Sequence, residues 1–300
     1  MAGRAGRGGA AGPVSGLGSP PMPVRIVTDS AADLPAAEAE RLGVAVVPLS
    51  IRFGTDEYTD GVNLSVAEFY DKLATASELP ETAAPSPGAF EAAFRRQGEA
   101  GADAVVCINL SSGLSATIQA AQNAAKAVAG DLDVRVVDSL SITSGLGTQV
   151  TLAAEAAAGG ASADDVVALV EGLVGRTHVI GALDTLDNLK KGGRIGGAQA
   201  LLGSLLSIKP LLDISTGEVA EAGRARTRRK ALEWLRDKVF ARPAVEQLCL
   251  AHGMAPDVDQ MLALLAPRYA ADQVRVSLVG PTIGTHGGPR VMGLTWIDPA

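Results

Sequence analysis

Aromatic residues are scarce in this chain. They make up 3% of its 300 residues, with two Trp, three Tyr and five Phe. Hydrophobic residues as a whole still reach 47%, so a core must be built from Ala, Val, Leu and Ile. The length suits one large domain or two of ordinary size, with room for a substantial apolar interior. Any internal pocket is therefore expected to have a smooth, aliphatic wall.

Cysteine and histidine are also rare. Cys107 and Cys249 lie in separate apolar runs, without a C-x-x-C pair or the Cys/His spacing of a metal site. They are interpreted as buried thiols in a reducing compartment, so a cytoplasmic location is expected. His178, His252 and His286 are far apart in the sequence and form no local metal motif. We expect neither a metal nor another cofactor.

A basic surface and long apolar runs are missing as well. The formal net charge of −7 argues against nucleic acid binding, because phosphate contacts need a positive surface. No run of about 18 apolar residues is present, so stable membrane insertion is not expected. Residues 1–23 are rich in Gly, Ala and Pro and lack the continuous apolar stretch of a secretory signal. They are interpreted as a disordered tail.

Apolar strand-like runs alternate with helical patterns along the rest of the chain. Over residues 24–175 the strands are almost continuously apolar, which is typical of a parallel sheet covered by helices on both faces. We predict an N-terminal, Rossmann-like parallel α/β domain there. Residues 176–300 are expected to form a second α/β domain with a mixed or antiparallel sheet.

Capping residues and periodicity predict individual elements. Val44–Phe53 is predicted to form one unusually long strand, Leu114–Val128 a helix, and Gln199–Ser207 a short apolar helix. Three serines that precede helical patterns are predicted to be helix N-caps: Ser65, Ser86 and Ser162.

A turn rich in hydroxyl groups follows the apolar run Ala104–Cys107. In Ser111–Thr117, four of seven residues are Ser or Thr, which is more than one helix cap needs. Such a turn collects hydroxyls and free backbone N–H groups, the usual construction of an anion site. Thr28–Ser30 and Asp138–Ser139 also follow strands, and the carboxyl ends of parallel strands meet at one sheet edge. We predict an anion site at that edge, with two further candidate loops at Thr82–Ser86 and Gly284–Pro289.

The motifs of common enzymes fail in this sequence. Gly113–Thr117 lacks the final glycine of a nucleophile elbow, and neither a P-loop nor a dinucleotide fingerprint is present. One enzymatic alternative stays open, a serine-dependent acyl hydrolase or transferase with Ser115 as nucleophile and His286 as base. No motif supplies a third, orienting carboxylate, so binding of an anion is favoured.

Nine segments, taken in order, resemble the DegV family of fatty-acid-binding proteins that partner a fatty acid kinase. They run over about residues 24–297 and read VTDSAADLP, VVPLSIRFG, DGVNLSVAEFYDKL, TAAPSPGAFEAAF, INLSSGLSATIQAA, VVDSLSITSGLG, LDNLKKGGRIGGAQALLGSLLSIKPLL, RARTRRKAL and GTHGGP. The resemblance implies a two-domain fold that buries a long-chain fatty acid. It also implies that a separate kinase phosphorylates the presented carboxylate, so that the chain is a carrier and not an enzyme.

The resemblance assigns roles to particular positions. Thr82, Ser115 and His286 match the family residues that hold the carboxylate. Ser30, at the expected floor of the pocket, and Ser112, in the hydroxyl-rich turn, complete the candidate ligand-binding set. Two further candidates match arginines of the region that docks the kinase, namely Arg194 and Arg226. We expect a monomer.

Four positions depart from the family's motifs around the expected site. Ala83 and Ala84 replace Ser and Gln, Ala116 replaces Gly, and Arg290 alters the loop after His286. These changes leave the ligand preference and the acyl length open. A third possibility is therefore a binding module for another anionic amphiphile, such as a bile-acid-like or retinoid-like molecule.

Overall fold

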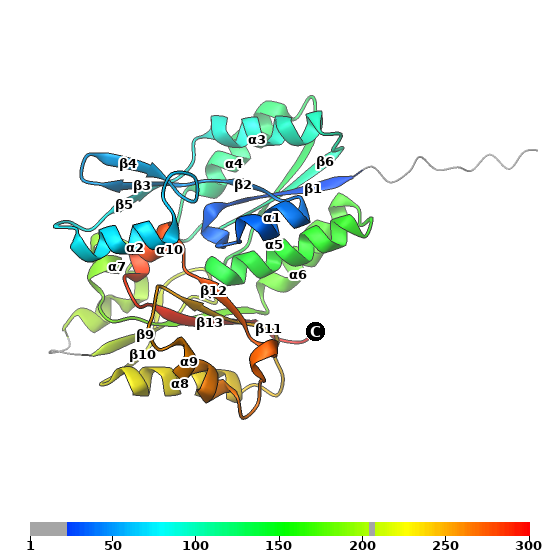
Figure 1. The fold of residues 1–300 in the computed structure, drawn as a ribbon. Coiled ribbons are helices and arrows are strands. Elements are labelled where there is room, and N and C mark those ends of the chain that lie inside the picture. Colours follow the sequence, from blue (N-terminus) through cyan, green and yellow to red (C-terminus); the bar gives the residue numbers. More distant parts are fainter. Residues whose placement is uncertain (1–22, 204–207) are drawn as a thin grey trace, which may run out of the picture.

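The computed structural model describes residues 23–203 and 208–300 (Figure 1). The tail predicted at residues 1–23 lies outside this part of the chain except for Pro23. The helix predicted at Gln199–Ser207 lies outside it in part, because residues 204–207 are not described. Before that gap, Gly196–Gly203 forms a 3-10 helix, η2.

The first sheet has four parallel strands in the order β2 (Ala45–Val47), β1 (Val24–Asp29), β6 (Ala104–Asn109) and β7 (Asp133–Asp138). All of its pairings are parallel, so the predicted parallel N-terminal sheet is confirmed. The sheet is seen almost edge-on in the upper half of Figure 1.

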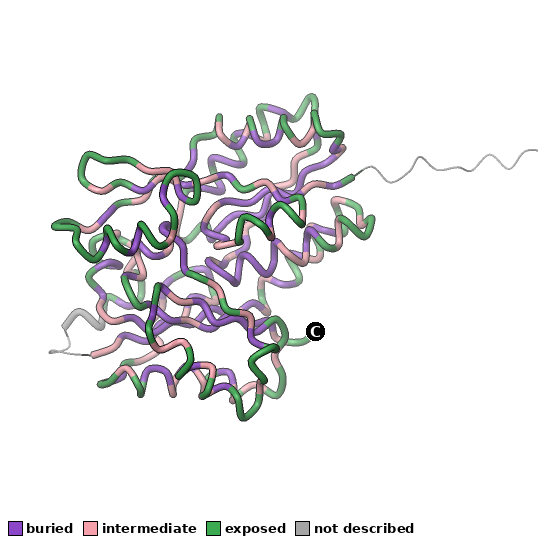
Figure 2. The backbone as a smooth tube through the Cα atoms, in the orientation of Figure 1, coloured by how far each residue is buried: buried purple, intermediate pink, exposed green. Residues whose placement is uncertain are grey.

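Helices cover both faces of this sheet. On one face lie α3 (Pro87–Glu99) and α4 (Thr117–Val128), whose apolar residues share a core with Val27, Val105 and Cys107. On the other face lie α1 (Ala36–Leu42), α5 (Thr143–Ala158) and α6 (Ala163–Val174). Buried residues follow the strands and the inner sides of these helices in Figure 2.

The three predicted N-caps are confirmed. Ser65 and Ser162 form complete capping boxes at the starts of α2 (Val66–Thr75) and α6. Ser86 accepts a hydrogen bond from the Ala89 N–H and is followed by a proline at the first helical position of α3. Local side-chain chemistry therefore fixes where these helices begin.

The prediction of one strand over Val44–Phe53 was wrong. The run divides at Pro48, which has no N–H to donate to a ladder. Before it, β2 pairs with β1; after it, β3 (Ser50–Phe53) pairs antiparallel with β4 (Asp56–Thr59) and β5 (Glu81–Ala83) in a separate small sheet. This small sheet and α2 share their own core of apolar residues, Ile51, Leu64, Phe69, Tyr70 and Leu73.

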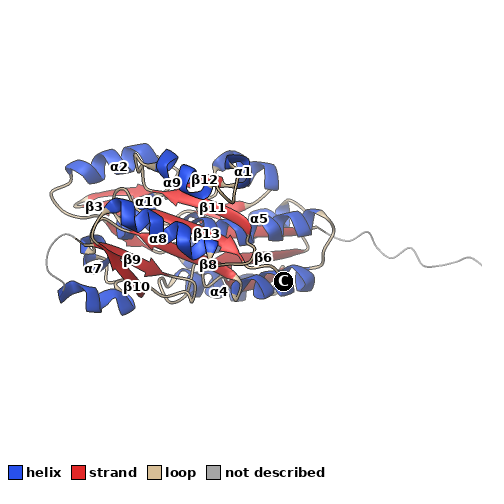
Figure 3. Ribbon diagram, turned by 90° about the horizontal axis from the view of Figure 1, so that it is seen from below, coloured by secondary structure: helices blue, strands red, loops and turns tan. Residues whose placement is uncertain are grey.

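The chain enters a six-stranded sheet after α6. Its order is β10 (Ala220–Ala225), β9 (Lys209–Asp213), β8 (Thr177–Ala182), β13 (Met292–Ile297), β11 (Glu246–His252) and β12 (Arg275–Leu278). Only the β11–β12 pair is parallel, which confirms the expected mixed sheet. Helices α8 (Arg228–Phe240) and α9 (Val258–Leu265) cover its lower face in Figure 1, and Figure 3 shows them from below in front of the strands.

Short helices occupy the junction between the two sheets. They are η1 (Ser30–Ala32), α7 (Asp187–Lys191) and α10 (Pro281–Gly287). Outside the junction, the short helix η3 (Ala271–Gln273) stands between α9 and β12. The loop predicted at Gly284–Pro289 was in large part wrong, because Pro281 starts the helix α10 and Gly288, with φ of 76°, ends it. The helix predicted from Leu114 begins only at Thr117, since the preceding residues form the hydroxyl-rich turn.

Candidate functional site

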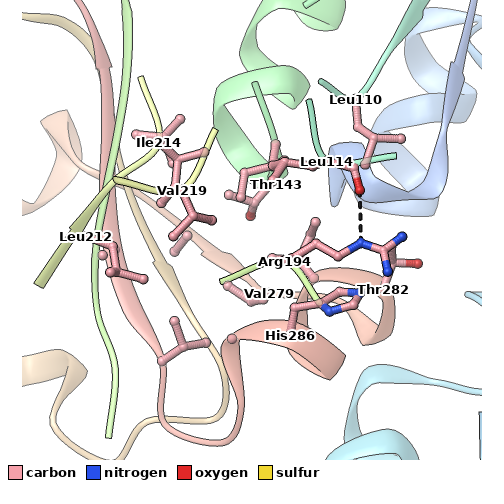
Figure 4. A pocket seen from close by; sticks show the side chains of 18 of the residues that line it. Leu110, Leu114, Thr143, Arg194, Leu212, Ile214, Val219, Val279, Thr282 and His286 are labelled. Atoms are coloured by element: carbon pink, nitrogen blue, oxygen red, sulfur yellow. Dashed lines mark hydrogen bonds between the residues drawn. The ribbon is translucent and has the colours of Figure 1, made fainter. Parts of the chain in front are cut away.

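A cavity lies between the six-stranded sheet and the segments that carry β5, the turn before α4, and α10. Together with the open space at its mouth it encloses about 910 Å³. Its wall is the upper face of the six-stranded sheet, with side chains such as Val179, Leu212 and Ala251 from three different strands. These side chains are buried and aliphatic, as the lack of aromatic residues leads one to expect. Figure 4 shows Leu212, Ile214 and Val219 on this side of the cavity.

Of the polar residues that line the same cavity, four are partly exposed, which places them toward the surface, whereas Thr143, Thr282 and Thr295 are buried. Thr82 lies on β5, Ser115 in the turn before α4, Arg194 after α7, and His286 near the end of α10. Each is partly exposed, whereas the wall residues are buried. We call this group the polar mouth. Three of its members are the residues that the resemblance assigned to the carboxylate, and the fold brings all three to one cavity.

Thr82 and His286 are in direct contact. The Thr82 hydroxyl oxygen lies 3.0 Å from His286 Nε2, across 204 positions of sequence. Burial, and then the charge of Arg194, lower the pKa of His286 from 6.5 to about 4. The imidazole is therefore neutral near pH 7.

The other ring nitrogen of His286 decides the direction of this hydrogen bond. Nδ1 is buried and has no hydrogen-bond partner among the described residues. A buried N–H without an acceptor is rare, so the proton is assigned to Nε2. His286 then donates to Thr82, and the Thr82 O–H is left free to donate into the cavity.

Gly192 fixes the position of the His286 ring. A Cβ atom at residue 192 would lie 2.2 Å from His286 Nδ1, so only glycine fits at this position without displacing the ring. The pair of glycines after α7 also explains the course of the chain. Gly193 has φ of 68°, and this left-handed residue turns the backbone so that Arg194 points back to the cavity.

Ser115 sits in the hydroxyl-rich turn. Its hydroxyl lies 2.8 Å from the Thr117 hydroxyl and accepts a hydrogen bond from the Thr117 N–H. Ser111 is buried and donates to the carbonyl of Gly217, so it holds the turn in place. The turn therefore contributes one hydroxyl, that of Ser115, to the polar mouth.

Two candidate ligand-binding residues lie elsewhere. Ser30 is not among the residues that line the cavity; its hydroxyl donates to Asp60 and accepts from the Leu49 N–H. Ser112 is exposed and also lies off the lining, with its backbone N–H bound to Asp138 Oδ1. Both follow strand ends at the predicted sheet edge, but the Ser30 hydroxyl is occupied by other partners and Ser112 is exposed.

Arg194 and Arg226 are placed very differently from each other. Arg194 is half-buried in the polar mouth, where its Nε donates to the carbonyl of Leu114 at 3.1 Å and an Nη donates to the carbonyl of Gly192 (Figure 4). The sequence had suggested a surface role for it, and the Gly192-Gly193 turn is the signal that could have indicated otherwise. Arg226 is exposed between β10 and α8.

The geometry does not favour a catalytic serine. Ser115 and His286 each have another hydroxyl partner, and no hydrogen bond joins them in the described residues. A nucleophile needs its base within hydrogen-bond reach, and the base in turn needs an orienting group. Nδ1 of His286, where such a group would act, is unpartnered in this part of the structure.

Within residues 23–203 and 208–300, no three His, Cys, Asp or Glu residues gather as ligands of a metal ion would. None of the helices there combines the length and apolar character needed to cross a bilayer.

The fold and the cavity together define a class, that of two-domain α/β proteins with an apolar pocket that opens at a polar mouth between the domains. The chain belongs to the DegV family: a family model described as "Uncharacterised protein, DegV family" matches residues 23–298. A DegV domain-containing protein of Listeria monocytogenes is 35% identical over 277 residues, which cover 91% of this chain and 98% of the relative.

Solved structures share the whole architecture. One, described as fatty acid binding of a DegV family protein from Thermus thermophilus, superposes with a TM-score of 0.85 at 34% identity and covers 93% of this chain and 100% of that one. Another, described as a stearic acid-binding protein from Eubacterium ventriosum, gives a TM-score of 0.83 at 25% identity, covering 92% and 98%. The two-domain fold expected from the resemblance is thereby confirmed.

Proposed function

We propose that the protein binds one long-chain fatty acid, with its acyl chain in the cavity and its carboxylate at the polar mouth. The observation that carries this proposal is a single cavity that combines a buried aliphatic wall with Thr82, Ser115, Arg194 and His286 at its open end. The fatty acid ligands of the related structures support the choice of ligand over other anionic amphiphiles.

The acyl chain and the carboxylate of the fatty acid contribute to binding in different ways. Each buried CH₂ group contributes about 0.8 kcal/mol, so a chain of about 16 carbons offers on the order of 10 kcal/mol before ordering costs. Moving a carboxylate out of water, by contrast, is unfavourable unless the carboxylate is hydrogen-bonded in the protein. The Thr82 and Ser115 hydroxyls supply donors, and the Arg194 guanidinium supplies positive charge.

The proposal extends to a partner. The carboxylate would lie at the surface end of the cavity, where a separate fatty acid kinase could phosphorylate it. The resemblance of Arg226 to kinase-docking arginines, together with its exposure, supports a contact surface beside β10 and α8. The protein then acts as a carrier that presents the acyl group, and the kinase carries out the chemistry.

Ligand extraction and a double mutant test the binding site. Organic extraction of the purified protein should release a fatty acid that mass spectrometry identifies. Thr82→Ala combined with Ser115→Ala should weaken binding of a fluorescent fatty acid at least tenfold, since both hydroxyl donors are lost. The control is Thr75→Ala with Ser77→Ala, two exposed hydroxyl residues away from the cavity. Unchanged affinity in the first double mutant would reject the site.

The kinase step needs its own experiment. With a purified DegV-partner kinase and ATP, the loaded protein should yield acyl phosphate. Arg226→Ala should reduce this product strongly and leave fatty acid affinity as in the wild type, because Arg226 does not line the cavity. Full activity of the variant would remove Arg226 from the contact surface.

A further inference from the structure

Helix α10 carries His286, and its first residues are anchored on the N-terminal domain. The Gly280 N–H, just before the helix, donates to Asp33 Oδ1 at 3.0 Å. The Thr282 N–H donates to Asp60 Oδ2 at 3.2 Å, and the Thr282 hydroxyl donates to the same oxygen. The first N–H groups of a helix have no partner within it, so these carboxylates satisfy donors that would otherwise be orphaned.

Asp60 is the better connected of the two carboxylates. It is 6% exposed, and besides the two donors of Thr282 its Oδ2 accepts from the Ser30 hydroxyl at 3.0 Å. Ser30 in turn accepts from the Leu49 N–H, which lies between β2 and β3. This explains the position of Ser30, because its hydroxyl links Asp60 to the start of the small sheet.

The carboxylates have no cation beside them. No Lys, Arg or His among the described residues forms an ion pair with Asp29, Asp33 or Asp60. Burial raises the pKa of all three, and their mutual repulsion adds to this for Asp29 and Asp33. Among the described residues these carboxyl groups therefore meet hydrogen-bond donors and no cation, and three of the donors lie at the start of α10.

A short helix moves as a rigid unit, so the position of its first turn sets the position of its last. Thr282 and His286 are four residues apart, so they lie on the same face of α10, about one turn from each other. Both line the cavity. Any rotation of α10 that moved Thr282 away from Asp60 would also turn His286 away from Thr82.

The middle of α10 is held by the same segment. Tyr70 on α2 donates to the carbonyl of Val279, and a Cβ at Gly284 would lie 2.7 Å from the Tyr70 oxygen. Figure 1 shows α2 and α10 side by side. The stretch from β3 to β5 therefore contacts α10 at its start through Asp60, in its middle through Tyr70 and at its end through Thr82.

We propose that Asp60 is a positioning residue for the carboxylate site: by holding Thr282 it fixes the rotation of α10 and keeps His286 in hydrogen-bond reach of Thr82. The proposal rests on the proposed fatty acid function for its consequence, but the position of His286 can be measured without ligand. Asp60 touches neither the cavity nor the reacting group.

Two substitutions at residue 60 separate geometry from charge. Asp60→Asn keeps an oxygen that can accept from Thr282 and Ser30, whereas Asp60→Leu keeps the approximate size and removes the acceptor. In the ligand-free protein with ¹⁵N-labelled histidine, the titration of His286 reports its position, because in place it stays neutral down to about pH 4. His178 and His252 serve as internal references, and Asp71→Leu, at an exposed carboxylate, is the matched control.

In Asp60→Leu we expect the His286 midpoint to move toward 6.5 and fatty acid affinity to fall at least tenfold. Asp60→Asn and Asp71→Leu should keep the wild-type midpoint and stay within about threefold of wild-type affinity. If Asp60→Leu does not fold, Thr282→Val, which removes one donor to Asp60, should shift the midpoint in the same direction by less, and Thr282→Ser should restore it.

A loss of stability in Asp60→Leu does not by itself support the proposal. Asp60→Leu with an unchanged His286 midpoint overturns it, whether or not affinity falls, because the helix then keeps its position without Asp60. If the wild-type protein itself binds no fatty acid, the proposed function fails, and the histidine titration still decides the positioning role.

Discussion

The wall and the mouth of the cavity are built in opposite ways. The wall consists largely of side chains from several strands of one sheet, among them Val179 on β8, Leu212 on β9 and Ala251 on β11. The mouth takes Thr82 and His286 from elements 204 positions apart, and Ser115 and Arg194 from turns between them. Burial on the wall is non-directional and is shared by many residues, whereas the mouth depends on individual atoms at hydrogen-bond distance. The wall should therefore tolerate apolar exchange, and the mouth should not tolerate displacement.

A charged side chain in the wall should have the largest effect on stability and on fatty acid binding. Leu212→Asp places a carboxylate at a position that is 2% exposed, on a strand whose neighbours are apolar. Leaving water without a partner costs several kcal/mol, so the thermal midpoint should fall sharply and fatty acid binding should be lost. Leu212→Met, which conserves volume, is the control and should bind within a few-fold of the wild type. Thermal unfolding and fluorescent fatty acid titration measure both; a Leu212→Asp protein that binds normally would place the acyl chain elsewhere.

Features that depend on neighbouring residues were predicted from the sequence, whereas features that depend on contacts between distant segments were not. The parallel sheet, the N-caps at Ser65, Ser86 and Ser162, and the hydroxyl-rich turn are local patterns, and the structure confirms them. The division of Val44–Phe53 depends on which partner each half meets, and periodicity alone does not contain that information.

The sequence alone marked the segments that carry Thr82, Ser115 and His286 as candidates, but only the family resemblance predicted that these three residues share one site. Nothing near Thr82 in the sequence indicates a partner 204 positions away, since the contact arises where β5 meets α10 in the folded chain. Helix α10 itself has seven residues, too few for a periodic signal, and so residues 284–287 were expected in a loop. The inward course of Arg194 depends on the positive φ of Gly193, a backbone property that residue type suggests but does not fix.

Displacing His286 should have the next largest effect on fatty acid affinity. Gly192→Ala brings a Cβ to 2.2 Å from Nδ1, so the ring must move and its contact with Thr82 is lost. Fatty acid affinity should drop about tenfold, the equivalent of one hydrogen bond of about 1.4 kcal/mol. Gly130→Ala, where nothing lies within 4 Å of the new Cβ, should bind as the wild type does. Equal affinities in the two variants would mean that the mouth adapts as readily as the wall.

The pH dependence of stability tests how deeply His286 is enclosed. Its pKa is about 4 in the folded protein, against 6.5 for a histidine in water, so the unfolded chain gains a proton first as pH falls. Stability should therefore decrease from about pH 6.5 downward, by about 2 kcal/mol between pH 7 and 5 from this residue. Asp29 acts with the opposite sign, because its pKa is raised to about 6 by burial and the folded state binds its proton first.

Comparison with His286→Gln isolates the histidine contribution, since Asp29 is common to both proteins. Chemical denaturation at pH 7 and pH 5 should show a steeper loss of unfolding free energy in the wild type than in the variant. Parallel losses would indicate that the imidazole is solvated and that the mouth is more open than its contacts suggest.

The smallest effect on fatty acid affinity is expected for substitution of Ser112. This substitution tests whether the polar mouth extends beyond Ser115. The Ser112 side chain is exposed and lies off the cavity, while its backbone N–H, which any residue except proline retains, binds Asp138. Ser112→Ala should therefore change fatty acid affinity less than twofold, whereas Ser115→Ala, three residues on, removes a hydroxyl that lines the cavity. The two titrations with the same fluorescent ligand form a matched pair within one turn. Equal losses would extend the polar mouth along the whole turn, and would make the number of hydroxyls, rather than the position of one, the property that holds the carboxylate.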